Sequence, residues 1–219
     1  NKSQPSTEHL VILVHGILRS GGSFAALKDD LETNGYEVAA ISYASTRLTL
    51  EEHADNLELL LNRLDGVKKI SFVTHSMGGL VVRETLSRKS LWKDKINLGR
   101  VVMIAPPNQG SAIADMMKDD LSYQLVYGVS GQQLASTYAA SMPPITTEFG
   151  IIAGGIRDMD GYNPWIDGDD DGVVSVKETH LPGAQDFLVI DALHSTILNK
   201  PETSTSVVNF LRYGQFTFG

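Results

Sequence analysis

The sequence predicts an α/β fold, a single domain built on a mostly parallel sheet of about six strands flanked by helices. Short, almost continuously apolar runs alternate with longer segments whose apolar residues recur at helical spacing, which is typical of strands joined by crossover helices. The runs hold few polar residues, as expected for strands that helices bury on both faces. With 219 residues, of which 42% are hydrophobic and 20% charged, the chain has the length and composition for one large core.

Six apolar runs are expected to form the strands, with room for a helix in most of the intervals between them. Most of these runs are bounded by polar residues, glycine or proline, which end strands. The expected strands are residues 10–15, 37–43, 69–75, 100–105, 150–156 and 187–190.

Four further segments have the apolar spacing of amphipathic helices. Ser23 is expected to cap the first helix, and Gly35 and Gly66 follow the ends of the first two. The third helix is expected directly after the third strand, and the fourth closes the chain. The expected helices are residues 23–33, 49–64, 77–87 and 203–211.

Two segments interrupt this alternation. Residues 106–149 separate the fourth and fifth strands and contain two helix-like pieces, 111–117 and 131–140. Insertions of this length in compact domains are more often functional than structureless. Residues 158–182 are rich in Gly, Asp and Pro, and we expect an ordered loop there.

Charge and composition exclude several functions. The formal net charge of −8 disfavours binding to nucleic acid or to anionic membrane surfaces. The absence of cysteine excludes disulfides, thiolate metal sites and a cysteine nucleophile. No apolar run is long enough to span a bilayer, and the polar segment 1–9 has no signal-peptide core, so we expect a soluble chain of undetermined localisation.

The segment Thr74-His75-Ser76-Met77-Gly78-Gly79 lies between an apolar strand and an expected helix. A nucleophile elbow requires such a sharp strand-to-helix turn, with small residues that let strand and helix approach each other. Thr74 stands where the usual G-x-S-x-G pattern has its first glycine. Ser76 is the predicted nucleophile, and the alternative is a plain Ser-x-Gly-Gly loop that ends a strand.

A second glycine-containing turn follows the first strand, at His15-Gly16. Acyl transfer needs two preorganised backbone N–H groups to stabilise the negative charge that develops on the substrate oxygen. One comes from the residue after the nucleophile, here Met77, and the other from the loop after this strand, for which Ile17 is the candidate. Taken alone, His15-Gly16 is equally compatible with an ordinary turn.

Five stretches, in order along almost the whole chain, resemble the α/β-hydrolase superfamily, and within it the compact bacterial lipases and esterases. They are VHGILRSGGSF, FVTHSMGGLVVR, VVMIAPPNQGS, DGVVSV and LHS. The resemblance implies a single α/β-hydrolase domain over residues 1–219. It also implies that residues 106–149 form a short cap or lid over the site after the fourth strand.

The superfamily places its acid and histidine after the serine, in that order. His194 follows the last strand and is the predicted general base, with His180 as the alternative. Asp171 is the predicted acid because related lipases carry theirs immediately before a Gly-apolar-Val stretch, and Asp170 is the alternative. His75 is expected to point away from Ser76 and to pack or hydrogen-bond locally.

A calcium-binding pattern overlaps the predicted acid. Residues 167–178 match D-x-D-x-D-G-x5-E, the loop of an EF-hand. Helix-breaking residues flank the match on both sides, around Pro164 and Pro182, whereas an EF-hand needs a helix on each side. We therefore expect a solvated acidic turn that carries one catalytic aspartate, and a weaker, non-EF calcium site stays open as the alternative.

The sequence thus predicts a serine hydrolase of the esterase or lipase type, with a small-molecule or lipid ester as substrate and with no cofactor or metal. The substrate would carry an apolar acyl chain of undetermined length. Two alternatives stay open. One is a hydrolase scaffold that has lost catalysis and acts as a calcium-binding or interaction module, and the other is a thioesterase, amidase or acyltransferase with the same triad.

Overall fold

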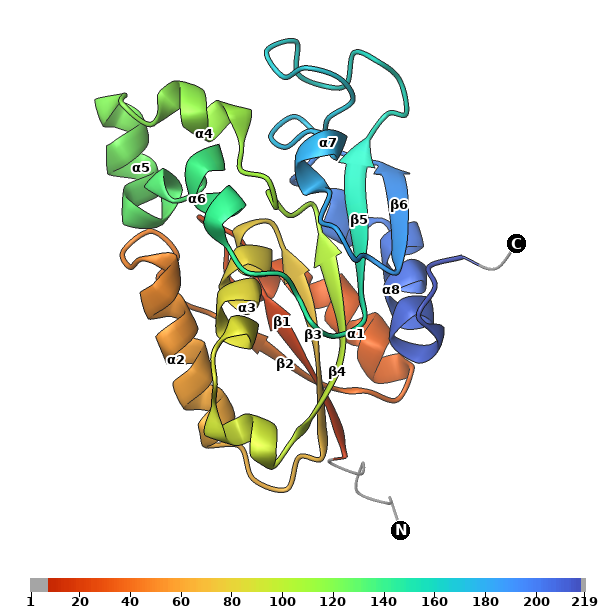
Figure 1. Cartoon of the computed structure of the whole chain (residues 1–219). Helices are drawn as coiled ribbons and strands as arrows, with labels where there is room; N and C mark the ends of the chain where they lie inside the picture. The colour runs from red at the N-terminus through yellow and green to blue at the C-terminus, as the bar shows by residue number, and fades with distance from the viewer. Residues whose placement is uncertain (1–7, 218–219) are drawn as a thin grey trace.

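The computed structural model describes residues 8–217, and most of the polar N-terminal segment discussed above lies outside this range. Within it, six parallel strands form one sheet in the order β2-β1-β3-β4-β5-β6 (Figure 1). The fold class predicted from the sequence is confirmed. The strands are β1 (His9–Val14), β2 (Glu37–Ile41), β3 (Lys69–His75), β4 (Asn97–Ile104), β5 (Phe149–Gly155) and β6 (Asp186–Asp191).

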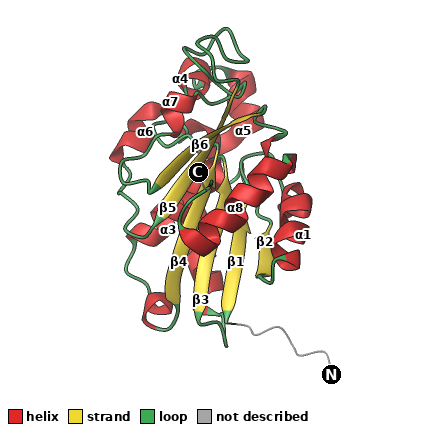
Figure 2. Ribbon diagram, turned by 90° about the vertical axis from the view of Figure 1, so that its right-hand side faces the viewer, coloured by secondary structure: helices red, strands yellow, loops and turns green. Residues whose placement is uncertain are grey.

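Helices cover both faces of the sheet, and alternate side chains of each strand pack against them. Ile12 and Val14 of β1 pack in a core with α2 (Leu50–Asn62) and α3 (Met77–Ser87). Val11 and Leu13 pack on the opposite face with α1 (Ala25–Thr33) and α8 (Pro201–Tyr213), which Figure 2 shows on its near side. None of the helices in residues 8–217 has the length and apolar character to cross a membrane. Three short 3-10 turns complete this part: η1 (Gly21–Phe24), η2 (Leu91–Asp94) and η3 (Ile197–Asn199).

Helix α2 begins one residue after its predicted start and has a side-chain cap, whereas α1 lacks its predicted cap. Thr49 caps α2 by accepting a hydrogen bond from the Glu52 N–H, and the Glu52 carboxylate accepts one from the Thr49 N–H. Ser23, the predicted cap of α1, lies inside η1, and α1 begins at Ala25 without a side-chain cap. The prediction was wrong because the chain enters α1 through a 3-10 turn whose backbone bonds already satisfy the first N–H groups.

The insertion, residues 106–149, contains three helices above the carboxyl ends of the strands (Figure 1). They are α4 (Ala112–Met117), α5 (Leu121–Gln132) and α6 (Ser136–Ser141). The predicted helix 131–140 was wrong, because its first residues end α5 and the chain turns before α6. Within α5, Gly128 interrupts the helix at φ 60° and ψ −155°, where a Cβ atom would lie 1.9 Å from the Thr46 carbonyl oxygen. A glycine is therefore required where α5 crosses the loop after β2.

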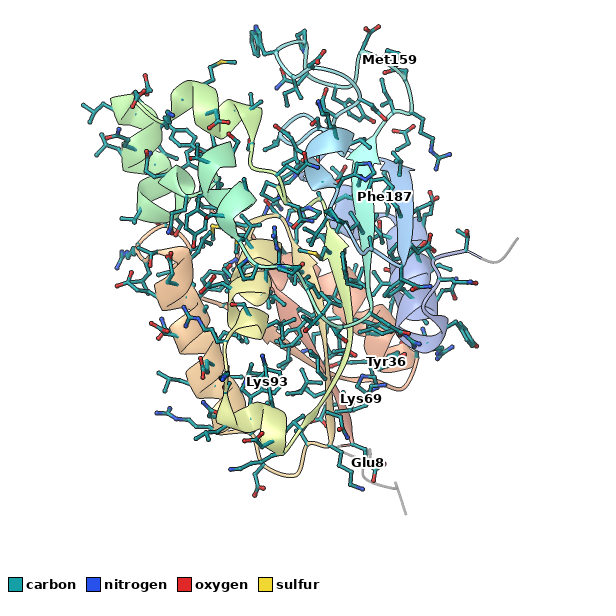
Figure 3. The ribbon with its side chains drawn as sticks, viewed as in Figure 1. Glu8, Tyr36, Lys69, Lys93, Met159 and Phe187 are labelled. Atoms are coloured by element: carbon teal, nitrogen blue, oxygen red, sulfur yellow. The ribbon has the colours of Figure 1, made fainter. Side chains whose placement is uncertain are left out.

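The acidic loop between β5 and β6 is ordered, as expected, and also holds a one-turn helix that the sequence did not indicate. This helix, α7 (Val176–Thr179), begins with Ser175 and Glu178 in a capping box. In Figure 3, Met159 of the loop lies at one end of the molecule, and Glu8 and Lys69 lie at the other. Loops that follow the strands and residues that begin them are thus at opposite edges of the sheet.

Candidate functional site

Ser76 forms the turn between β3 and α3, at the carboxyl edge of the sheet, where parallel α/β sheets bind their ligands. Its backbone lies at φ 53° and ψ −130°, a strained conformation for a residue with a side chain. Two glycines leave room for the turn. A Cβ atom at residue 78 would lie 2.2 Å from the Val14 carbonyl oxygen, and one at residue 16 would lie 2.8 Å from the Cβ of Ser76.

Thr74, which replaces the usual first glycine of the pattern, fits against the neighbouring strand. Its side chain is buried, and its hydroxyl lies 3.4 Å from the Val102 carbonyl oxygen of β4. Gly79 on α3 provides the space, because a Cβ atom there would come within 3.3 Å of the Thr74 hydroxyl. The sharp turn therefore forms without glycine at position 74.

Asp171 and His194, 23 residues apart, come together beside this turn. The His194 ring nitrogen Nδ1 lies 2.7 Å from Asp171 Oδ2, and the His194 N–H donates to the Asp171 carbonyl oxygen at 2.8 Å. The Asp171 carboxylate is buried, and its Oδ1 accepts hydrogen bonds from the N–H groups of Val173 and Val174 at 3.0 and 2.8 Å. These bonds hold the carboxylate in one orientation against the imidazole ring.

Ser76 and His194 line the same cavity, of about 180 Å³, together with Ile17. Most of its other walls are apolar and come from the insertion and the loop after β5. Tyr123, Tyr127 and Leu134 of the insertion are among them. Other apolar side chains of the insertion do not line this cavity: Met116, Met117, Leu121, Leu125 and Val126 are exposed, and the Tyr138 hydroxyl donates to Glu51.

The predicted oxyanion donors, Ile17 and Met77, flank the serine. Met77 is the first residue of α3, so its N–H has no partner within the helix. Within residues 8–217 the Ile17 N–H has no hydrogen-bond acceptor, whereas the next N–H, of Leu18, donates to the Ser45 hydroxyl at 3.0 Å. Among the described residues, both N–H groups are therefore left without a hydrogen-bond acceptor.

His15 fixes the turn that carries Ile17. Its Nδ1 lies 2.7 Å from the Gly16 carbonyl oxygen, and its Nε2 accepts a hydrogen bond from the Tyr43 N–H at 3.2 Å. The Tyr43 ring stacks on the imidazole, with centroids 4.2 Å apart. Burial lowers the pKa of His15, which favours the neutral ring that this donor and acceptor pair requires.

Neither alternative from the sequence contacts the His194–Asp171 pair as base or acid. His180 is exposed and stacks on Phe187 with ring centroids 4.1 Å apart. Asp170 is buried, and its carboxylate accepts hydrogen bonds from the N–H groups of Asn163 and Gly172 at 3.1 and 2.5 Å. The hydrogen bonds of the Asp170 carboxylate organise the loop. Burial of this carboxylate raises the pKa of Asp170.

His75 differs from its prediction, since its partner is far away in sequence. Its Nε2 lies 3.1 Å from the carbonyl oxygen of His194, 119 residues later. The two rings have centroids 4.7 Å apart. The sequence contains no signal for this pairing except that His75 is adjacent to Ser76.

The calcium-loop pattern finds no support in the geometry. The Glu178 carboxylate accepts hydrogen bonds from the N–H groups of Ser175 and Ala112 at 2.8 and 2.6 Å. The Asp169 carboxylate accepts those of Ile156 and Arg157. No group of three or more acidic, histidine or cysteine side chains in residues 8–217 is arranged to hold a metal ion. The carboxylates shape the loop instead.

The parallel sheet, the strained serine after its third strand and the late histidine together form an α/β-hydrolase fold. The chain belongs to the family described as "Domain of unknown function (DUF7379)", whose model matches residues 1–145.

Lipases and esterases are among its structural neighbours. The fold is similar to that of the mature lipase BlEst2 from Bacillus licheniformis, with a TM-score of 0.75 and 16% identity over 98% of this chain and 95% of that one. It is also similar to the metagenomic carboxyl esterase MGS0156, with a TM-score of 0.68 and 19% identity over 89% and 66% of the chains. Methylesterase 3 of Arabidopsis thaliana is 23% identical over 163 residues, 68% of this chain, and the match spans 58% of that relative's length.

Proposed function

We propose that this chain is a serine hydrolase that cleaves carboxylic esters through an acyl-enzyme. Ser76 is the nucleophile, His194 the general base, and Asp171 the acid that orients it. The observation that carries the proposal is the 2.7 Å contact between His194 Nδ1 and the buried Asp171 carboxylate, in a cavity that His194 shares with Ser76. The lipases and esterases among the structural neighbours support the same reaction class.

The contact with Asp171 sets the tautomer of His194. An acceptor carboxylate requires the proton on Nδ1, which leaves the lone pair of Nε2 free for the serine hydroxyl. As Ser76 Oγ bonds to the ester carbonyl carbon, its proton passes to Nε2, and the carbonyl oxygen becomes an oxyanion. The N–H groups of Ile17 and Met77 bind that oxyanion, while the Asp171 carboxylate stabilises the imidazolium.

The intermediate collapses when the ester C–O bond breaks and Nε2 returns the proton to the departing alkoxide. A water molecule then repeats the sequence. It gives a proton to His194 and attacks the acyl carbon, and Ser76 leaves with that proton. The products are an alcohol and a carboxylic acid, and no cofactor is consumed.

The cavity size favours a short acyl group. At about 180 Å³ the cavity is smaller than the roughly 300–1,000 Å³ that is usual for ligand pockets. Ile17, Tyr127 and Leu134 give it apolar walls that suit a hydrocarbon chain. The insertion thus acts as a cap over one side of the site. In a series of nitrophenyl esters, we expect kcat/KM to be highest for short acyl chains and to fall for long ones.

A fluorophosphonate probe tests the assignment directly. We expect it to label Ser76, identified by peptide mass, and the S76A variant to lose both labelling and ester hydrolysis. The matched control is S87A, at the exposed end of the same helix, which retains both. Full ester hydrolysis by S76A would overturn the proposal. Parallel assays with thioesters, and with alcohols as acyl acceptors, separate an esterase from a thioesterase or an acyltransferase.

A further inference from the structure

His75 is a buried histidine next to the nucleophile that the proposed reaction does not use. Its side chain is 1% exposed, and its Nε2 lies 3.1 Å from the His194 carbonyl oxygen. A carbonyl oxygen can only accept, so the proton of the His75 ring is on Nε2. The strand that delivers Ser76 therefore also donates a hydrogen bond to the loop that carries His194.

That loop is held from two sides. Asp171 binds the N–H and the ring of His194, and His75 binds its carbonyl oxygen. Within residues 8–217, the His75 ring is the sole donor to this carbonyl. Without it, the peptide after His194 would lose its fixed orientation, and Asp171 alone would restrain the imidazole.

The environment keeps the His75 ring neutral. Its Nδ1 is buried without a hydrogen-bond partner among the described residues, so a second proton would gain no acceptor. Burial, with His194, Arg19 and His15 as the nearby charged or titratable groups, holds the pKa of His75 well below its usual range. The ring thus stays a single-tautomer donor while His194 gains and loses its proton.

We propose that His75 is a positioning residue, which holds the carbonyl of His194 and thereby sets the place of its imidazole ring relative to Ser76. The inference rests on the proposed function of Ser76 and His194. It predicts that the Nε2–H donor of residue 75 affects the chemical step and has little effect on substrate binding.

Three substitutions separate the donor from the ring. H75F keeps a planar ring and removes the donor, H75N keeps an amide that is too short to reach the carbonyl, and H75Q places an amide N–H near the position of Nε2. We expect H75F and H75N to lower kcat about 10- to 100-fold with KM within twofold, the scale of a small misplacement of a catalytic group. H75Q should recover to within about threefold of the wild type, because it restores the donor.

A control substitution, H9F, removes a histidine that bonds to Ser71 at 2.9 Å near the opposite end of the sheet, where Figure 3 shows Glu8 and Lys69. It should keep kcat. Thermal unfolding identifies any variant that is not folded. If H75F does not fold, the comparison of kcat between H75N and H75Q still tests the role of the donor. Equal kcat values for H75N and H75Q would overturn the inference, since the reach of the donor would not matter.

Labelling of Ser76 separates a failure of the proposed function from a failure of the proposed role of His75. We expect the fluorophosphonate to react with the wild type, and more slowly with H75F and H75N in proportion to kcat. A wild type that does not react overturns the proposed function. A wild type that reacts, with H75F and H75N reacting at the same rate, overturns the role of His75 and leaves the function standing.

Discussion

At the scale of single residues, the backbone of Ser76 stores strain that its neighbours must allow. The conformation of Ser76 costs about 1–3 kcal/mol, and it persists because β3 and α3 fix both sides of the turn. The missing side chain of Gly78 lets α3 approach the end of β1, which carries the loop with Ile17. Position 78 therefore couples Ser76, the proposed nucleophile, to the loop of Ile17, the proposed oxyanion donor.

G78A should destabilise the protein even though alanine favours helices. The gain in helix propensity is about 1 kcal/mol, whereas a Cβ atom 2.2 Å from the Val14 carbonyl oxygen forces backbone to move. We expect a net loss of about 2–4 kcal/mol in the free energy of unfolding, measured in urea, and loss of most esterase activity. G22A is the control, because its new methyl group would meet its nearest atom at 3.4 Å. Equal stability of the two variants would contradict the steric argument.

D171N and D170N distinguish the two adjacent acids. Asparagine at 171 cannot stabilise an imidazolium and can donate to Nδ1, which favours the wrong tautomer, so kcat should fall roughly 10²- to 10⁴-fold. Asparagine at 170 disturbs bonds to Asn163 and Gly172, so the main effect should be on stability. Steady-state kinetics with urea unfolding measures both. If D170N has the larger loss of kcat, the assignment of the acid is wrong.

The order of strands along the chain predicts that Ser76 and His194 lie close together, but it does not predict the contact made by His75. Ser76 and His194 each follow a strand, and parallel strands bring their carboxyl ends to one edge, so the sequence predicts that these residues meet. The bond from His75 to the His194 carbonyl depends on where a loop passes in three dimensions, and no periodicity or motif encodes it.

At the scale of elements, one arginine holds both ends of the insertion. The buried guanidinium of Arg83, on α3, donates to the carbonyl and side-chain oxygens of Asn108 at 3.1 and 3.3 Å. It also donates to the carbonyl oxygens of Met142 and Pro143 at 3.2 and 3.3 Å. Burial lowers the pKa of Arg83 to about 10, so the group stays charged at neutral pH.

R83M should loosen the insertion selectively. Methionine fills similar space but leaves buried oxygens of Asn108 and Met142 without a hydrogen-bond donor. Removing the buried charge of Arg83 relieves its desolvation, but the loss of those hydrogen bonds is larger. We expect the free energy of unfolding to fall by about 2–4 kcal/mol. We expect faster amide hydrogen exchange in residues 106–149 than in β1 and β3, followed by mass spectrometry. R88M is the control, since Arg88 follows the end of α3 and forms partly exposed ion pairs with Asp55 and Glu84, so its loss should cost about 1 kcal/mol or less. If R83M accelerated amide hydrogen exchange equally in residues 106–149 and in the sheet, Arg83 would not hold the insertion specifically.

The strands and long helices were predictable because burial on both faces, helical spacing and local caps are properties of contiguous sequence. The apolar spacing that predicts a helix over residues 49–64 is one example. The interruption inside α5 was not predictable, because Gly128 meets the Thr46 carbonyl oxygen of a loop that is distant in sequence. The helix α7 was missed because one turn has no periodicity, and its Glu178 also matched a calcium pattern.

At the scale of the whole molecule, four histidine rings have lowered pKa values and so stay neutral more readily in the folded state than in the unfolded chain. Burial is the first cause in each case, and it lowers the pKa of His9 to about 4. The pKa values of His15, His53 and His75 are also lowered. Since an unfolded histidine has a pKa near 6.5, the unfolded chain binds more protons than the folded chain below that pH.

The free energy of unfolding should therefore be nearly constant between pH 8 and 7 and fall as the pH drops from about 6.5 towards 5. Each histidine contributes at most about 1.4 kcal/mol per pH unit, and His9, which is half-buried, contributes less because solvent screens it. Asp170 has the opposite sign, because its raised pKa lets the folded chain bind a proton first. Urea unfolding across this range measures the slope, and H9F or H75Q should reduce it, since each removes a group that protonates on unfolding. Stability that rises on acidification from pH 6.5 would mean that histidine burial does not dominate the pH dependence of this fold.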